Sequence, residues 1–267
     1  MAALALTDKS IIIIGGTTGI GLSAAKAFVE AGAQVVVVGR NPENVARAGS
    51  ELGKSAVALA ADATSPQTAI KAIHAAIENF GGFHGLYHVA GGSGRRMGDG
   101  PLHEITDAGW EFTLSLNLTS LFYSNRAAVT QFLKQGTGGS ILNMGSVLGF
   151  SPSPKFFAAH AYATTKAAII GLTKSAAAFY ANKNIRFNVL APALVETPMS
   201  ERAQQDPAIM AFIAAKQPLD GGRIGQPSDL DAAAVYFMSD ESRFVTGQVL
   251  AVDGGWCVSE GGMKNEE

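Results

Sequence analysis

The chain has 267 residues, of which 47% are apolar and 16% charged, and its formal net charge is −2. This composition suits a large buried core and excludes a disordered chain. The near-neutral charge gives no reason to expect nucleic acid or an anionic membrane as a partner. The single cysteine, Cys257, excludes an intrachain disulfide, and we expect no metal site.

The first residues, MAALALTDKS, lack the basic and long apolar regions of a signal peptide. No stretch approaches the ~20 apolar residues that a membrane span needs. We therefore expect a cytoplasmic protein.

Seven short, mostly apolar runs alternate with longer helical patterns along the chain. The runs are SIIIIGG, AQVVVVGR, SAVALAAD, GLYHVAGG, GSILNMGS, IRFNVLAP and GQVLAVDGG. Nearly continuous apolar runs are typical of parallel strands that are buried on both faces. The pattern predicts an α/β fold with a doubly wound, seven-stranded parallel sheet, in a single domain over 1–267.

Two of the intervening helices carry recognisable end signals. After the first run, apolar residues recur at helical spacing, and Gly32 is the expected C-cap. After the third run, Thr64 or Ser65 is the expected N-cap, with Pro66 in the first turn.

The first run is followed by GGTTGIG, which places Gly15, Gly19 and Gly21 in a G-x-x-x-G-x-G arrangement. Glycines permit the tight turn and let backbone N–H groups of a helix N-terminus approach a pyrophosphate. Such a turn alone is weak evidence, but its place between a buried strand and an amphipathic helix favours a dinucleotide site.

The second run ends at Gly39 and Arg40, where an acid would bind the ribose 2′-hydroxyl of NAD. A guanidinium instead suits a 2′-phosphate, so NADP(H) is favoured and NAD(H) stays possible. The alternative is that Arg40 is a solvated residue at a strand exit. After the third run, Asp62 could accept a hydrogen bond from adenine or be an ordinary loop acid.

Four polar residues follow in the middle of the chain. Ser146 ends the fifth run, and Tyr162 and Lys166 share one face of the next helix at i and i+4. A cation at ~4 Å and an effective dielectric of ~20 stabilises phenolate by ~4 kcal/mol, so we expect the pKa of Tyr162 to fall close to neutrality. Asn117 is an amide among apolar residues, and it is either structural or holds a water. The structural alternative is that Tyr162 packs in the core and Lys166 is solvated beside it, without a chemical role for either.

With these motifs in order, the chain resembles the short-chain dehydrogenases/reductases, in the compact branch that includes the β-ketoacyl-carrier-protein reductases. The resemblance covers about residues 7–256 and rests on GGTTGIG, ADAT, VAGG, Asn117, NMGS, YATTK, NVLAPALVETPM and GQVLAVDGG. It implies a Rossmann-type fold, a catalytic tetrad of Asn117, Ser146, Tyr162 and Lys166, and a homotetramer or homodimer. The expected cofactor contacts are Gly15, Thr18, Gly19, Ile20, Gly21, Arg40, Asp62, Ala63, Ala90, Gly91, Tyr162, Lys166, Pro192, Val195 and Thr197.

In this reading Tyr162 is the general acid/base, Ser146 holds the substrate oxygen, and Asn117 holds a water that links Lys166 to solvent. The expected function is NADP(H)-dependent hydride transfer between nicotinamide and a small-molecule carbonyl or secondary alcohol. An NAD-dependent alcohol or sugar dehydrogenase is the alternative, and a non-catalytic nucleotide sensor is the third possibility.

Departures from the family pattern include isoleucine at position 14, His88 in HVAG, for which a structural role is favoured, and Ala193 after Pro192. The loop 147–161 is longer than usual and should shape the substrate entrance. A lid is expected over about 196–222 and a polar tail over about 259–267. Arg95 and Arg96 either meet an anionic group, such as a carboxylate or a carrier phosphate, or are solvated. His160 faces either the pocket or solvent.

Overall fold

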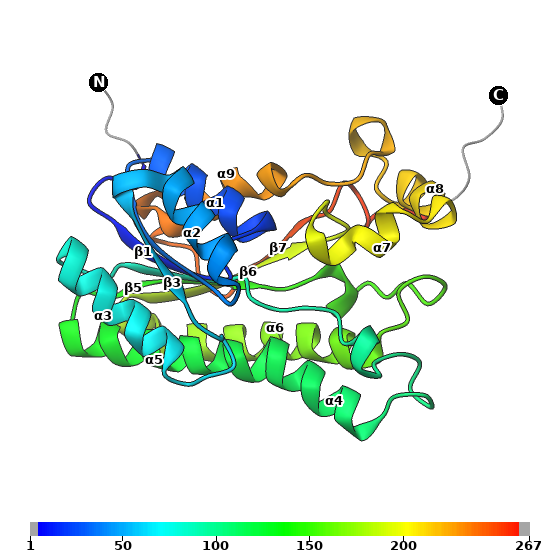
Figure 1. Cartoon of the computed structure of the whole chain (residues 1–267), viewed down its shortest axis with the longest axis horizontal. Coiled ribbons are helices and arrows are strands. Elements are labelled where there is room, and N and C mark those ends of the chain that lie inside the picture. The colour runs from blue at the N-terminus through cyan, green and yellow to red at the C-terminus, as the bar shows by residue number, and fades with distance from the viewer. Residues whose placement is uncertain (1–4, 262–267) are drawn as a thin grey trace.

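A computed structural model describes residues 5–261 of the chain, in which a central sheet is covered by helices on both faces (Figure 1). The strands are β1 (Ser10–Ile14), β2 (Gln34–Gly39), β3 (Ala56–Ala60), β4 (Gly85–His88), β5 (Gly139–Met144), β6 (Ile185–Pro192) and β7 (Val249–Val252). All neighbouring pairs are parallel, in the order β3-β2-β1-β4-β5-β6-β7. The predicted doubly wound, seven-stranded sheet is confirmed.

The α-helices of the described residues lie in two layers. They are α1 (Gly19–Glu30), α2 (Pro42–Leu52), α3 (Thr68–Phe80), α4 (Asp107–Leu114), α5 (Ser120–Gln135), α6 (His160–Tyr180), α7 (Glu201–Gln204), α8 (Pro207–Lys216) and α9 (Asp231–Met238). Figure 1 shows α1, α2 and α9 on one side of the sheet and α3, α5 and α6 on the other. None of these helices is both long enough and apolar enough to cross a membrane.

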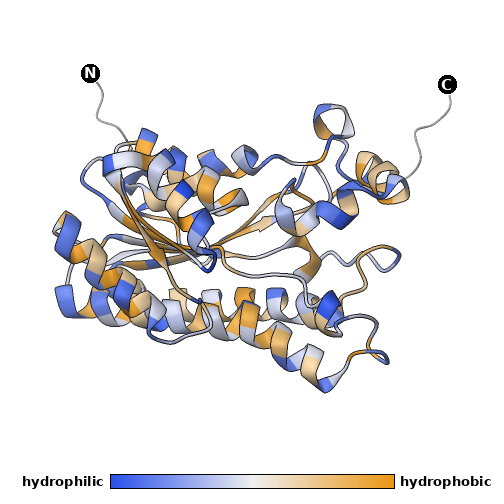
Figure 2. Ribbon diagram, in the orientation of Figure 1, coloured by the Kyte–Doolittle hydropathy of each residue, from blue (hydrophilic) through white to orange (hydrophobic). Residues whose placement is uncertain are grey.

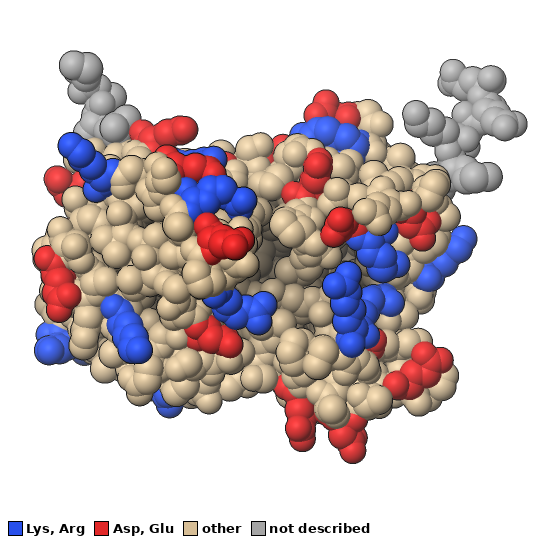
Figure 3. All heavy atoms as spheres, in the orientation of Figure 1, with Lys and Arg blue, Asp and Glu red and all other residues tan. Residues whose placement is uncertain are grey.

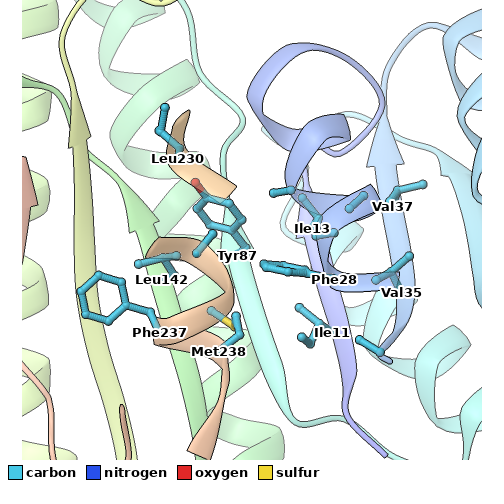
Figure 4. Close-up of a cluster of buried hydrophobic side chains, with 14 of the residues drawn as sticks. Ile11, Ile13, Phe28, Val35, Val37, Tyr87, Leu142, Leu230, Phe237 and Met238 are labelled. Carbon is cyan, nitrogen blue, oxygen red and sulfur yellow. The ribbon is translucent and has the colours of Figure 1, made fainter. Parts of the chain in front are cut away.

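The core explains why the strand runs are apolar at successive positions. In β1, Ile11 and Ile13 pack into one hydrophobic cluster, and Ile12 and Ile14 pack into another. Successive strand residues point to opposite faces, so a strand covered on both sides needs apolar residues throughout. Figure 2 shows the hydrophobic colour along the strands, and Figure 4 shows Ile11 and Ile13 facing Phe28 from α1 in the first cluster.

The strand order places a crevice at one edge of the sheet. The chain runs outward from β1 through β2 to β3, then returns to add β4 on the other side of β1. Ligands of open α/β sheets bind beyond the carboxyl ends of the strands at such a reversal.

Two predicted helix ends need correction. Helix α1 is capped at Ala31, and Gly32, with φ 97°, follows the cap. The Gly32 N–H donates to the Val29 carbonyl, and the Ala33 N–H donates to the Phe28 carbonyl. This pair of hydrogen bonds is a Schellman motif.

Helix α3 begins at Thr68, with Gln67 rather than Thr64 or Ser65 at the cap. The reason is that the Asp62 carboxylate accepts hydrogen bonds from the N–H and the hydroxyl of Thr64, which holds the segment in a turn.

The segment predicted as a lid contains α7 and α8. Its apolar residues Ile209 and Ile213 are buried against Trp256 from the C-terminal segment. Residues 262–267 of the expected polar tail lie outside the described residues.

Candidate active site

A cleft of ≈610 Å³ lies at the carboxyl ends of β1 to β6. Most of the residues predicted from the sequence line it: Gly15, Thr18, Gly19, Ile20, Arg40, Asp62, Ala63, Ala90, Gly91, Ser146, Tyr162, Lys166, Pro192, Val195 and Thr197. Gly21 and Asn117 are not lining residues and support the cleft from behind.

The turn between β1 and α1 is built for close approach of a ligand to the backbone. Gly15 has φ 88° and Gly19 has φ 50°, conformations that favour glycine. A Cβ on Gly21 would lie 2.0 Å from the Gly15 carbonyl oxygen, so the helix start packs directly on the turn. Thr18 makes no capping hydrogen bond with its side chain, and the first turn of α1 holds no acid. The free N–H groups and the dipole of α1 therefore fit a pyrophosphate.

Arg40 lies at one end of the cleft, beside Asn41, Asn44 and Asp62. Its side chain is exposed, while Asn41 is occupied in capping α2 through the N–H groups of Glu43 and Asn44. Hydrogen bonds from Thr64, with a smaller contribution from the Arg40 charge, lower the pKa of Asp62. Arg40 is thus an exposed cation at the end of the cleft that follows β2.

Asn117 is buried in a π-helical segment, Ser115–Thr119, that joins α4 to α5. Its Oδ1 accepts from the Gly92 N–H at 3.0 Å, and its Nδ2 donates to the carbonyls of Gly92 and Thr113 at 2.9 Å. Both amide hydrogens are therefore used by the backbone. The Asn117 side chain therefore ties the segment after β4 to the helical segment that contains Asn117.

Ser146, Tyr162 and Lys166 meet at the centre of the cleft. Lys166 is buried, its Nζ donates to the Met144 carbonyl at 2.8 Å, and it lies 5.4 Å from the centre of the Tyr162 ring. The Ser146 side chain hydrogen-bonds to that of Tyr162 and caps the short turn after β5 through the Leu148 N–H. The predicted i and i+4 pairing of phenol and ammonium is confirmed.

The predicted titration of Tyr162 is wrong for the protein alone. Burial raises the pKa of Tyr162 to about 12, and the hydrogen bond from Ser146 only partly opposes this. Burial also lowers the pKa of Lys166 to about 8. Both effects arise because a low-dielectric site disfavours the charged form of each group. Spacing along the helix predicts the neighbouring ammonium but not this cost of burial.

Asp99 is a site residue that the sequence did not reveal. Its buried carboxylate accepts from the N–H groups of Ala161 and Tyr162, both at 3.0 Å, in the first turn of α6. The N-cap position, Ala159, has no side chain that could do this. Asp99 comes from the loop after β4, about 60 residues earlier, and no local motif marks it. It fixes the start of the helix that carries Tyr162.

His88 has the structural role that the sequence favoured. It is buried, its Nδ1 lies 2.7 Å from the Ser124 hydroxyl, and its Nε2 lies 3.1 Å from the Ala90 carbonyl. Burial, followed by the charge of Lys166, lowers the pKa of His88 to about 3. The ring is therefore neutral, and it supports the backbone of Ala90 where the cleft begins.

The other half of the cleft is partly apolar. Its lining residues here are Ser93, Arg95, Val147, Leu148, Phe157, Met199, Arg202, Ala203 and Trp256. Phe157 packs edge-on against Trp256, which also meets Phe212. Among the residues that the sequence left unassigned, Arg95 lines the cleft, whereas Arg96 and His160 are exposed and do not.

Comparison with known proteins gives consistent matches over most of the chain. The family described as "Enoyl-(Acyl carrier protein) reductase" matches residues 15–257. An NADP-dependent (R)-specific alcohol dehydrogenase from Lentilactobacillus kefiri is 33% identical over 94% of this chain and 97% of its own length.

Two solved structures are similar in fold and sequence. A short-chain type dehydrogenase/reductase from Mycobacterium ulcerans has a TM-score of 0.87 and 30% identity, covering 96% of this chain and 92% of its own. A 3-ketoacyl-(acyl-carrier-protein) reductase from Brucella melitensis, complexed with NADH, has a TM-score of 0.83 and 27% identity. The match covers 95% of this chain and 100% of that structure's chain.

Proposed function

Because the chain belongs to the short-chain dehydrogenase/reductase family, whose members are oxidoreductases of alcohols and carbonyls, we propose that it is an NADP(H)-dependent carbonyl reductase with Tyr162 as its proton donor. The observation that carries the proposal is the meeting of Ser146, Tyr162 and Lys166 in the cleft that also holds the glycine turn. When bound, the nicotinamide cofactor supplies or accepts the hydride.

The residues of the chain supply orientation and the proton. The Ser146 hydroxyl can donate to a carbonyl oxygen, which places that oxygen beside the Tyr162 hydroxyl. Because the pKa of Tyr162 is raised to about 12, the phenol carries its proton at neutral pH. It is therefore ready to protonate the oxygen as the carbonyl carbon is reduced. Lys166, still mainly charged below its pKa of about 8, stabilises the phenolate that develops.

Replacing Tyr162 tests this proposal. Tyr162→Phe should retain NADPH binding and lose reductase activity toward a panel of ketones and aldehydes, followed as NADPH absorbance. Tyr180→Phe is the matched control, because Tyr180 is on the same helix and stacks on Phe187 away from the cleft. Equal turnover by Tyr162→Phe and the parent would remove Tyr162 from the reaction. Tight cofactor binding with no oxidation by any carbonyl would favour the nucleotide-sensor alternative.

Arg40 supports NADP(H) over NAD(H), which remains the alternative. Its exposed guanidinium lines the cleft after β2, where a forked donor can hold a 2′-phosphate. Arg40→Ala should weaken NADPH about tenfold and leave NADH within about twofold. Arg47→Ala, an exposed arginine of α2 outside the cleft, should alter neither affinity. Equal losses for both cofactors in Arg40→Ala would contradict this role.

We also propose a homotetramer, with a homodimer as the alternative, and a cytoplasmic location. Large apolar side chains are exposed on neighbouring helices of one layer: Phe122 and Leu133 on α5 and Phe179, at 75% exposure, on α6. Apolar groups of this size favour burial against another copy. Phe179→Glu should lower the mass measured by light scattering after size exclusion. A monomeric parent would refute the assembly.

A further inference from the structure

The substrate half of the cleft contains two guanidinium groups, that of the half-buried Arg95 and that of the exposed Arg202. Arg95 follows β4, and Arg202 lies on α7 after β6. Within residues 5–261, neither forms an ion pair with a carboxylate. Asp62 is the one acid among the described lining residues, and it interacts with Arg40 at the other end.

Arg95 is held in place with most of its donors free. It is half-buried, and one terminal nitrogen donates to the Phe156 carbonyl at 3.2 Å. Asp99 is nearby, but its carboxylate accepts hydrogen bonds from the N–H groups of Ala161 and Tyr162 in α6, and within residues 5–261 it forms no ion pair with Arg95. A guanidinium has five N–H donors, so Arg95 can still offer a fork to a ligand.

The positive charge of Arg202 acts on Arg95. Burial, and then the positive charge of Arg202, lowers the pKa of Arg95, while Asp99 opposes this. The two cations are therefore close enough to repel each other without full compensation. An anion between them would relieve that repulsion.

The position of the pair relates it to the reacting groups. In the sheet, β5 lies between β4 and β6, and Ser146 follows β5 as Arg95 follows β4 and Arg202 follows β6. All three residues line the same cleft. Apolar side chains of Leu148, Phe157 and Trp256 line the same half. Figure 3 shows basic side chains beside the hollow in this face of the molecule.

We propose that Arg95 and Arg202 bind an oxyanion, a carboxylate or a phosphate, carried by the carbonyl substrate, with the apolar wall contacting the framework between the two groups. This inference rests on the proposed carbonyl reductase function and names its substrate class. A neutral ketone of the same shape would leave this pair of guanidiniums without an anionic partner.

The test compares each acid with its neutral partner. The carboxylate probes are 4-oxopentanoate, 4-oxocyclohexanecarboxylate and 4-acetylbenzoate, each against its primary amide, and the phosphate probe is dihydroxyacetone phosphate against dihydroxyacetone. For at least one pair, we expect kcat/KM with NADPH to be about tenfold or more higher for the anion. The carboxylate and phosphate arms show which oxyanion is preferred.

Arg95→Gln and Arg202→Gln should each reduce that preference about five- to tenfold, mainly through KM, while the neutral partner changes less than about twofold. Arg96→Gln is the matched control, since Arg96 is exposed and does not line the cleft. Arg95→Lys, which keeps the charge but loses the fork, should fall between parent and Arg95→Gln. If Arg95→Lys keeps part of the preference for the anion, loss of the hydrogen bond to the Phe156 carbonyl is not the sole cause of the effect of Arg95→Gln.

Three results would overturn the inference: equal kcat/KM for every anion and its neutral partner, an equal loss of preference in Arg96→Gln, or a parallel loss of NADPH affinity that assigns the arginines to the cofactor. If the neutral ketones are reduced without any anion preference, the proposed function stands and the inference fails. If no probe is reduced, calorimetric titration of 4-acetylbenzoate and its amide into the NADP⁺ complex decides. Binding of the acid alone, lost in Arg95→Gln and Arg202→Gln, supports the anion site, and binding of neither refutes it.

Discussion

Replacing Lys166 by methionine would measure how much the buried ammonium contributes to proton transfer. Its nitrogen lies 5.4 Å from the centre of the Tyr162 ring. At an effective dielectric of about 20, the attraction between ammonium and phenolate is about 3 kcal/mol. Burial raises the pKa of Tyr162 from 10.0 to about 12, which costs the phenolate about 3 kcal/mol. An ammonium at this distance can therefore stabilise the phenolate that develops during the reaction by about as much as burial destabilises it, and Lys166→Met removes that attraction.

The expected result is a reduction of kcat for carbonyl reduction by about 10- to 100-fold, because phenolate charge develops only partly in the transition state. Turnover is followed as NADPH absorbance with the best ketone of the panel. Lys174→Met is the control, an exposed lysine further along α6 and outside the cleft. The kcat of this control should stay within about twofold of the parent.

The pH profile provides a second readout. Lys166, with its pKa lowered to about 8, is charged below that pH and neutral above it. The parent should therefore lose reductive kcat as pH rises through about 8, and Lys166→Met should lack this limb. A variant that stays within about threefold of the parent and keeps the same limb would refute the electrostatic role.

Three further predictions concern the support of the site. Asp99→Asn should lower stability by about 1–2 kcal/mol in urea denaturation, because a charged cap and one acceptor are lost; an unchanged midpoint would contradict this. The pKa of His88 falls from 6.5 to about 3 on folding, so the unfolded chain takes up this proton at a higher pH than the folded protein does. As the pH falls from 6.5 to about 3, up to about 5 kcal/mol of stability is lost. His88→Asn should lose less stability than the parent in denaturation at pH 7, 5 and 4. Gly21→Ala should weaken NADPH at least about tenfold by fluorescence titration, because the new Cβ would strike the Gly15 carbonyl. Gly171→Ala is the control, because a Cβ at this position of α6 meets open space. It should bind NADPH with the affinity of the parent and melt at the same or a higher temperature.

Periodicity was enough to predict the sheet, because buried parallel strands require apolar residues at every position, as in β1 and β2. The cleft followed from the same argument, since residues such as Gly15, Arg40 and Ser146 come directly after strands. The start of α3 was less predictable, because Asp62 competes for the local backbone through a turn.

Long-range effects account for the rest. Asp99 reaches α6 from a distant loop, and Arg202 faces the cleft only because α7 folds back over it. The pKa of Tyr162 depends on burial, which spacing along a helix does not report. The sequence therefore indicates which groups are present at the strand ends, whereas their protonation and partners require the packed structure.

The apolar cluster that includes residues of α7 and α8 is separate from the three other hydrophobic clusters of the described residues, which pack on the sheet. Val147, Ile209, Ile213 and Trp256 pack together there, and Trp256 also lines the cleft. Changes in this cluster can reshape the wall against which a substrate rests without disturbing the β-strand core. The shape of this wall therefore depends on packing that is separate from the packing that holds Tyr162 and Lys166 in α6.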